Sequence, residues 1–430
     1  MAAIGATGSR TGFAARAAFY LVAGVIAVVG LVALADRLLL GLKVTALSST
    51  ITWGLWIALY ILFVGLSAGS FLLSTMVYVF NVRELERVGR LALLTAILAL
   101  GGAMVFVWID LGHPERVLSV VTSWQGRSVM AIEFVFYAAY IVLMVVELWF
   151  LMRLDLAAAG CREGVRARIA RVLSLGFRYP VTTEGYAAAA AAAMRVAKVA
   201  GIIGIPLAIG VHGGTGAIFA VVVARPYWNS GLFPIMFLVS ALASGAALMT
   251  FLYATLGRRD DGFLPTLRRL ASLMILFIAL DALLVLADFV AGAYHPGTEA
   301  SATLGELAFG RFSLIFWGGE VGLALALPVL LVALRGRSAF WLGTAGLSML
   351  LGIVAVRYDL VVPAYVRPVL PGLDQAYRDS RMVYEYIPAA SEWLIGVGVV
   401  AFLALLLALA LEILPLGQDI GRIGATRRSS

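Results

Sequence analysis

Long apolar stretches alternate with short polar connections along almost the whole chain. A helix of about 20 apolar residues crosses a hydrocarbon core of about 30 Å. Windows of that kind lie at residues 15–40, 52–80, 89–111, 128–152, 196–222, 230–256, 267–292, 312–334, 338–360 and 391–415. The pattern predicts an all-α integral membrane protein with ten transmembrane helices. The first window is longer than the apolar core of a signal peptide, so we expect it to be a true span.

The composition excludes a soluble protein. Of the 430 residues, 62% are hydrophobic and 13% are charged, whereas soluble domains are about 45–50% apolar and about 25% charged. The single cysteine, Cys161, excludes a disulfide framework, thiolate-held iron–sulfur clusters and cysteine zinc sites, because each of these needs several sulfur atoms. We therefore expect any metal redox centre to lie in another chain.

The distribution of basic residues predicts how the spans are oriented in the membrane. About two thirds of the 32 Lys and Arg residues fall in the termini or in the loops on the same side as the termini. The positive-inside rule then predicts a bacterial cytoplasmic membrane protein with both termini in the cytoplasm. The net charge of +8 is spread over many short loops. Because it forms no compact basic domain, we expect no nucleic-acid partner.

A weak internal repeat is present in the sequence. The small-residue segment at residues 66–70 in the second span is echoed at residues 242–246 in the sixth. Each segment is followed at similar spacing by an acid in the next span, and the span after that carries another acid in each half. These acids are Asp110 and Glu133 in the first half, and Asp288 and Glu320 in the second. The repeat predicts two four-helix bundles related by a two-fold axis along the membrane normal. The alternative is that small residues simply permit close helix packing.

The predicted spans and the internal repeat divide the protein into five regions. Residues 1–50 form the N-terminal tail and first span, 51–223 the first bundle, 224–362 the second bundle, 363–390 an outer loop, and 391–430 the tenth span and tail.

Two of the connections are long enough to carry structure of their own. The cytoplasmic loop at residues 153–195 combines an Arg-rich stretch of helical apolar spacing with an alanine run. It predicts an amphipathic helix at the membrane surface and an extension of the fifth span. The outer loop is rich in proline, acids and tyrosines, including Tyr377, Tyr384 and Tyr386. That composition suits either partner docking or an ordered lid over the bundle.

Titratable side chains gather near the outer ends of the spans. A charge inside a bilayer costs about 2.5–3.5 kcal/mol on insertion scales, so such acids call for a functional explanation. Glu133 and Tyr137 are four residues apart and share one helical face. His, Tyr and Glu side chains beside an apolar bundle can bind a quinone headgroup and exchange its protons, while the prenyl tail needs an apolar entry. We predict that Glu133, His113 and Tyr137 are the catalytic residues, which donate protons to the quinone or accept them from the quinol. The predicted quinone-binding residues are Asp110, Arg116, His212, Thr215 and Glu392.

Some of these residues also have structural interpretations. Asp110 could cap a helix–loop junction or pair with Arg116, Glu133 could hydrogen-bond to a neighbouring helix, and His212 could be a satisfied core histidine. For Glu147 and Glu412, near cytoplasmic helix ends, we expect snorkelling or charge pairing. The deeper acids Asp281, Asp288 and Glu320 are candidates for a proton route into the membrane.

The histidine content argues against haem in this protein. A haem b between helices usually needs two axial histidines, and the only histidines are His113, His212 and His295. We therefore expect neither haem nor metal here, with electrons entering or leaving through a cofactor in a partner.

Several segments, taken in order and spacing, resemble the NrfD/PsrC-like membrane subunits of polysulfide-reductase-type complexes. The matching residues are Trp53-Gly54-Leu55, the stretch 64–74, Asp110-Leu111-Gly112-His113-Pro114-Glu115-Arg116, Thr215-Gly216, Ala224-Arg225-Pro226-Tyr227-Trp228 and the stretch 240–245. Ten spans and Tyr386-Ile387-Pro388 before Glu392 are similar to a longer branch of that family. This branch includes hydrogenase-type, sulfite-reductase-associated and alternative complex III anchors.

The resemblance implies a haem-free subunit that exchanges electrons between a quinone pool, menaquinone or ubiquinone, and an extracytoplasmic ferredoxin-like iron–sulfur subunit. That subunit would connect to a catalytic subunit, which could be of the molybdopterin type. In the longer branch a fourth-span Glu is implicated in quinone or proton chemistry, and Glu133 matches it. Ile132 departs from the Trp that relatives often carry beside this acid, which weakens inferences about the shape of the headgroup pocket.

Two other classes of function fit parts of the pattern. Ten spans, a duplicated core and buried acids also describe many secondary transporters. A purely structural anchor, in which the polar cluster only packs the bundle, is the third alternative.

Overall fold

The computed structural model describes residues 10–294, 297–368, 372–376, 379 and 381–416, so His295 and Tyr377 lie outside the described residues. Throughout the described ranges the regular structure is helical. Ten helical segments are long and apolar enough to cross a membrane, which confirms an integral membrane all-α protein. They contain α1 (Arg10–Leu40), α2 (Leu55–Tyr78), α3 (Glu86–Asp110), α5 (Val129–Gly160), α7 (Thr183–Ala220), α8 (Phe233–Leu256), α9 (Phe263–Ala293), the π-helix η5 (Ile315–Ala326) continuing as α11 (Leu327–Arg335), α12 (Ala339–Val361) and α14 (Ala390–Ile413).

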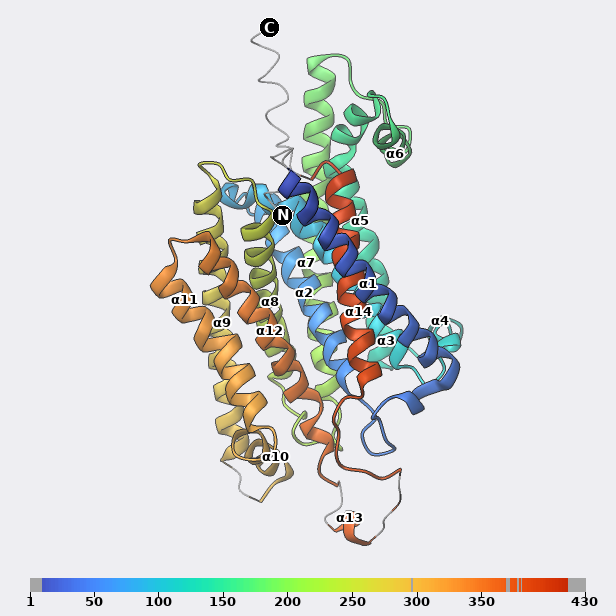
Figure 1. The fold of residues 1–430 in the computed structure, drawn as a ribbon, viewed down its shortest axis with the longest axis vertical. Coiled ribbons are helices and arrows are strands. Elements are labelled where there is room, and N and C mark those ends of the chain that lie inside the picture. The colour runs from blue at the N-terminus through green and yellow to red at the C-terminus, as the bar shows by residue number, and fades with distance from the viewer. Residues whose placement is uncertain (1–9, 295–296, 369–371, 377–378, 380, 417–430) are drawn as a thin grey trace.

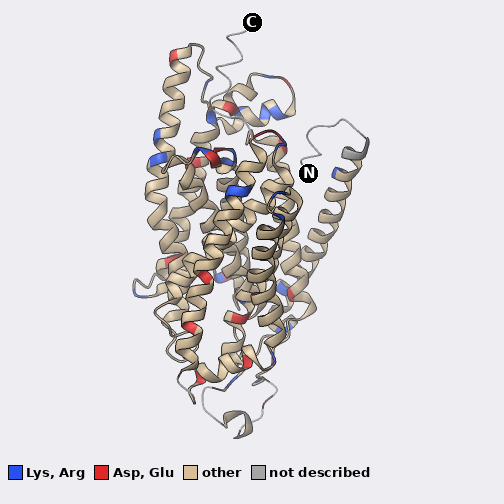
Figure 2. Ribbon diagram, turned by 90° about the vertical axis from the view of Figure 1, so that its left-hand side faces the viewer, with Lys and Arg blue, Asp and Glu red and all other residues tan. Residues whose placement is uncertain are grey.

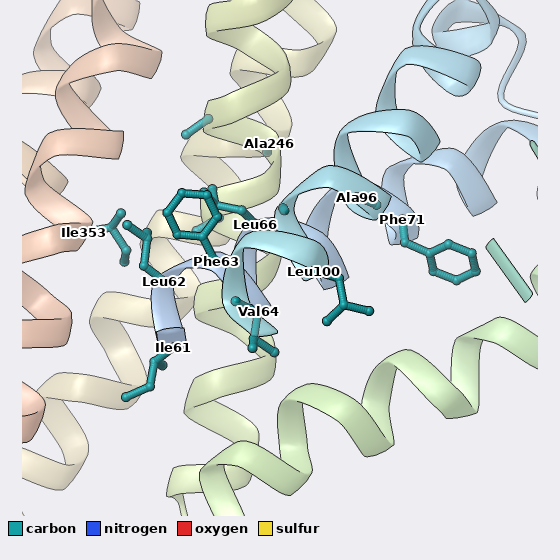
Figure 3. Packing of buried hydrophobic residues seen from close by; sticks show 14 of the residues in the cluster. Ile61, Leu62, Phe63, Val64, Leu66, Phe71, Ala96, Leu100, Ala246 and Ile353 are labelled. Carbon is teal, nitrogen blue, oxygen red and sulfur yellow. The ribbon is translucent and has the colours of Figure 1, made fainter. Parts of the chain in front are cut away.

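Helix α2 forms the centre of the molecule. Nearly all of its side chains are buried, because α3, α7, α8 and α12 pack around it. Figure 3 shows Ile61, Phe63 and Leu66 of α2 pointing in different directions, with Ala246 of α8 and Ile353 of α12 nearby. A helix that is apolar all round is stable only when it is enclosed by others. The position of α2 therefore follows from its own composition.

The two small-residue segments meet at the contact between α2 and α8. A Cβ atom at Gly69 would overlap the carbonyl group of Ala241 and lie 2.9 Å from the Cα of Gly245. A Cβ at Gly245 would in turn overlap the backbone of Gly69. Equivalent segments that meet in this way are expected beside a two-fold axis. The division of the protein into two repeated bundles remains a prediction.

Helices α1 and α14 pack against each other at one flank of the bundle. Helix α1 begins and α14 ends at the same end of the molecule, as Figure 1 shows. We call this end the terminal face and the opposite end the distal face. In Figure 2 most Lys and Arg residues lie toward the terminal face, whereas acidic residues also occur deep in the bundle and toward the distal face.

The structure adds detail to the long connections. Helix α6 (Val165–Leu173) forms where an amphipathic helix was predicted, and the alanine run belongs to α7. Both helices are confirmed, and the position of α6 at the membrane surface stays a prediction. The pattern did not predict α10 (Glu299–Ala308) or the π-helix η5. Two further one-turn helices, α4 (Ser119–Thr122) and α13 (Leu373–Ala376), lie in distal-face connections.

Candidate functional site

A cavity of about 350 Å³ lies near the distal face, between α2, α3, α5 and the end of α7. Its walls are mainly apolar and aromatic, and Met130 at its edge is 55% exposed. The lining residues are Trp53, Ile57, Tyr60, Met104, Val107, Asp110, Leu111, Arg116, Val117, Val120, Met130, Glu133, Phe134, Tyr137, Ile218 and Phe219. An apolar cavity with a few convergent polar groups is the usual form of a small-molecule site.

Glu133 is the centre of a buried hydrogen-bond cluster at the wall of this cavity. Its Oε1 atom accepts hydrogen bonds from the hydroxyls of Tyr137 at 2.6 Å and Thr215 at 2.5 Å. The hydroxyls of Tyr60 and Tyr137 are 2.5 Å apart. Spans that are well separated in sequence therefore place three hydroxyls around one carboxyl. Both hydrogen bonds to the carboxyl fall on one oxygen, so the groups around Glu133 fix its orientation.

Asp110 ends α3 and also lines the cavity, and its Oδ1 atom is buried without a hydrogen-bond partner among the described residues. The buried Arg37 of α1 fixes the backbone on either side of this residue. Its Nε atom donates to the carbonyl of Ile109 at 3.0 Å and its Nη2 atom donates to the carbonyl of Leu111 at 2.6 Å. A buried oxygen without a partner is costly. Asp110 therefore offers an acceptor for a polar group inside the cavity.

The loop after Asp110 contributes Arg116 to the cavity but not His113. His113 is exposed, and its Nδ1 atom lies 2.8 Å from Glu115. A hydrogen bond from its own backbone amide, together with that from His113, holds the pKa of Glu115 below its usual range. Arg116 pairs with Glu115 at 3.9 Å, and not with Asp110 as one structural interpretation proposed.

Three predicted quinone-binding residues, Thr215, His212 and Glu392, are not among the lining residues of the cavity. Thr215 contacts it only through its hydrogen bond to Glu133. His212 is fully buried against Phe237, with 5.6 Å between ring centroids. Neither of its ring nitrogens has a hydrogen-bond partner among the residues that the structure describes. Glu392 begins α14 and accepts hydrogen bonds from the amides of Ala46 and Ala389, each at 2.9 Å. It also accepts one from Tyr386, and burial raises the pKa of that phenol. In this structure Glu392 joins the start of α14 to the connection that contains Ala46, which is distant in the sequence.

The three deeper acids of the second half come together. Asp281, Asp288 and Glu320 line one small cavity of about 80 Å³, along with Arg357 and Asp359. Ser230 donates to Asp288 at 2.6 Å. Both carboxyl oxygens of Asp359 are buried and have no hydrogen-bond partner in the described ranges.

A stripe of polar groups runs across the membrane from the Glu133 cluster, and the sequence pattern did not reveal it as a unit. On α5 it contains Tyr140 and Glu147, on the same helical face as Glu133. On α2 it contains Ser67, Ser70 and Ser74, on the same face as Tyr60. The Tyr140 phenol lies near Ser67. We call these five groups, Tyr140, Glu147, Ser67, Ser70 and Ser74, the polar stripe.

Within the part of the chain that the structure describes, every side-chain oxygen of the polar stripe is buried without a hydrogen-bond partner. Elsewhere in the protein, buried hydroxyls such as those of Ser244 and Thr250 donate to a carbonyl four residues earlier. The stripe hydroxyls do not. Buried polar groups without protein partners are typical positions for ordered water, so the stripe has the composition of a hydrated path.

Comparison with known proteins identifies the family. The family described as "Polysulphide reductase, NrfD" matches residues 43–369. The chain belongs to the NrfD family. It is 46% identical to a selenate reductase subunit of Mesobacillus selenatarsenatis, over 92% of this protein and 93% of that one.

More distant members of the NrfD family also match most of the sequence. The Hdr-like menaquinol oxidoreductase integral membrane subunit of Archaeoglobus fulgidus is 25% identical over 86% of each protein. A polysulfide reductase subunit of Wolinella succinogenes is 27% identical over 73% of this protein and 94% of that one. These relatives are named as parts of reductases and oxidoreductases.

Proposed function

We propose that this NrfD-family protein is the quinone-reactive membrane subunit of a multisubunit oxidoreductase. One observation carries the proposal: Asp110, Arg116, Glu133 and Tyr137, predicted from the sequence to bind or react with quinone, all line one cavity. The unpartnered Oδ1 atom of Asp110 supports it further, because a quinol hydroxyl can supply the missing donor. The menaquinol-linked relative agrees with this assignment.

The residues of the cavity have separate tasks. Oxidation of a quinol releases two electrons and two protons. Reduction of a quinone consumes two electrons and two protons. Glu133 is the proton acceptor or donor, and Tyr137 and Thr215 keep its carboxyl oriented by their hydrogen bonds. Asp110 and Arg116 hold the headgroup from the opposite side. The apolar walls accept the first prenyl units, so either menaquinone or ubiquinone fits these groups.

We place the terminal face in the cytoplasm of a bacterium, because the basic residues gather there. The quinone cavity then lies near the extracytoplasmic surface. A ferredoxin-like iron–sulfur subunit docked on the distal face would exchange electrons with the cavity and pass them to or from a catalytic subunit, for which the molybdopterin type is one candidate. This protein is proposed to contribute neither haem nor metal.

We further propose that proton translocation accompanies the reaction. The polar stripe begins at the Glu133 cluster and extends to Glu147, in the half of α5 nearer the terminal face. Its unpartnered oxygens suit a file of water molecules that exchanges protons between Glu133 and the cytoplasm. The cluster of Asp281, Asp288 and Glu320 is the corresponding candidate in the second half.

Filling the cavity tests quinone binding directly. Val107 lines the cavity, so in the purified complex Val107→Trp should lower labelling by a photoreactive short-chain quinone at least about tenfold, since the larger ring occupies the headgroup space. Val135→Trp is the matched control, because Val135 is 51% exposed and is not a lining residue. Equal labelling of the two variants would contradict the proposal.

A substitution at Arg37 tests whether this residue holds Asp110 in position at the cavity. In Arg37→Met the side-chain volume is nearly kept, but the carbonyls of Ile109 and Leu111 lose their donor. We expect the KM for quinol to rise about tenfold with a smaller change in kcat, because the reacting groups remain while the binding wall shifts. Steady-state kinetics of the complex measure both. The exposed Lys43, changed to Met, should leave both constants unaltered, and the same result for Arg37→Met would exclude the positioning role.

A substitution at Glu147 tests whether protons move along the polar stripe. Glu147→Gln keeps the shape of the side chain but removes a proton-carrying group. In proteoliposomes that contain the complex, proton exchange at the terminal face per electron transferred should fall at least about tenfold, as followed with an entrapped pH dye. The exposed Glu163, changed to Gln, is the control. Unchanged proton exchange in Glu147→Gln would mean that the protons take another path.

A further inference from the structure

A second and larger cavity lies in the other half of the molecule. It has a volume of about 450 Å³ and is enclosed by α9, η5, α12 and the end of α10. Most of its walls are apolar, with Phe289, Phe316 and Trp317 among them, and its only acids are Asp281 and Glu320. We call it the Glu320 cavity.

The Glu320 cavity lies open toward the lipid-facing surface. Three of its lining residues are strongly exposed: Phe309 is 86%, Leu286 59% and Trp317 52% exposed. In a membrane these side chains contact acyl chains, so an apolar molecule dissolved in the bilayer can reach the cavity without crossing water. The occupant must therefore be a lipid-soluble molecule.

The wall that carries Glu320 has an unusual backbone. Residues Ile315–Ala326 form a π-helix of 12 residues, whereas π-helical segments are commonly single turns and frequently mark functional sites. Neighbouring helices hold this wall in place. The indole of Trp317 donates to the carbonyl of Ala308 at 2.8 Å, and Ser348 donates to the carbonyl of Leu323 at 2.8 Å. The cavity is thus a formed part of the fold.

The two acids separate the apolar cavity from a polar interior. Asp281 and Glu320 also line the small cavity that contains Arg357. The charge of the Arg357 guanidinium acts on both carboxyls, while its Nη2 atom donates to the hydroxyl of Ser240 at 2.7 Å. One buried guanidinium can neutralise one carboxylate, and a second, uncompensated carboxylate would be costly there. A ligand in the Glu320 cavity therefore meets both a hydrogen-bond acceptor and a carboxylic acid that can donate.

This arrangement matches that of the Glu133 cavity. In each half an acid in the first two turns of a span, toward the distal face, lines an apolar cavity on one side and adjoins a polar cluster on the other. The spans that carry Glu133 and Glu320 are also the ones that the internal repeat pairs. The same chemistry is thus present twice in one protein.

We propose that the Glu320 cavity is a second binding site for a prenylated quinone or quinol, an inference that rests on the proposed function of the first cavity. The neutral headgroup has carbonyls that accept from the acid and hydroxyls that donate to the carboxylate. The phosphate of a phospholipid fits poorly as the headgroup at this position, because the one guanidinium nearby, that of Arg357, already compensates a carboxylate and leaves no positive charge to hold a phosphate. The prenyl tail leaves between Leu286, Phe309 and Trp317.

The test uses the whole complex in nanodiscs, with a photoreactive short-chain quinone as the probe. We expect labelled peptides from both α5 and η5. Ala282→Trp, at a lining position of α9, should remove at least about nine tenths of the η5 labelling and leave α5 labelling unchanged. Leu283→Trp, at the neighbouring position that is 62% exposed, should alter neither. Glu320→Gln should weaken competition by unlabelled quinone at the η5 site about tenfold, the scale of one buried hydrogen bond.

The possible outcomes distinguish the two proposals. Labelling of α5 without any labelling of η5, or co-purified phospholipid in the Glu320 cavity of a high-resolution map, would overturn the second site and leave the first intact. Labelling of neither helix would overturn the proposed function itself. Labelling of η5 that persists at full strength in Ala282→Trp would show attachment outside the cavity and also overturn the second site.

Discussion

Glu133→Gln is expected to reduce quinol-linked electron transfer by the assembled complex at least about a hundredfold, the scale of one general acid or base. The amide keeps the shape of the carboxyl and can still accept the hydrogen bonds of Tyr137 and Thr215 at its oxygen. It cannot take up or release a proton at neutral pH. The loss should therefore appear mainly in kcat, with the complex fully assembled.

The measurement is stopped-flow reduction of the partner's iron–sulfur clusters by a short-chain quinol, along with the ratio of subunits in the purified complex. Glu412→Gln is the matched control, because Glu412 hydrogen-bonds to Tyr20 at 3.0 Å near the terminal face, far from the cavity. Full activity in Glu133→Gln would show that Glu133 only packs the bundle and would favour the purely structural anchor.

The largest expected effect on stability comes from Gly69→Val at the contact of α2 and α8. The new side chain would overlap the Ala241 carbonyl, and this backbone group is unable to rotate away as a flexible side chain does. Overpacking of this kind costs about 3 kcal/mol or more. Because the contact joins the two halves of the molecule, we expect a clear drop in Tm or loss of the folded protein.

Thermal unfolding in detergent, followed by size-exclusion chromatography, measures this effect. Gly101→Val introduces the same side chain into the middle of α3, where an added Cβ meets nothing within 4 Å. This control should retain a Tm close to that of the unaltered protein. Equal stability of the two variants would mean that α2 and α8 can separate without cost.

Prediction from sequence succeeded for features that depend on local composition. The ten spans, the helix at α6 and the extension of α7 each follow from the periodicity or length of a continuous segment. The π-helix could not be predicted in this way, because its backbone is supported by contacts such as that of Ser348 with the carbonyl of Leu323.

The candidate site was predicted in part. Asp110, Arg116, Glu133 and Tyr137 were recognised as polar residues near one side of the membrane, and they share a cavity. Tyr60 joins them, although its position in an apolar span offers no distinguishing signal. The charge-pairing interpretation of Glu147 does not describe its surroundings, since both of its carboxylate oxygens lack partners.

The sequence by itself determined the number of membrane crossings and the depth at which each acid lies, because both depend on the distance along a single helix. Only the tertiary structure decided which polar side chains meet. His113, His212 and Glu392 have the same chemistry and similar depth as the cavity residues, yet they lie in the exposed loop, between the halves and at the start of α14. Rotation of each helix about its axis and the packing of its neighbours set that outcome, and these depend on residues that are distant in the sequence.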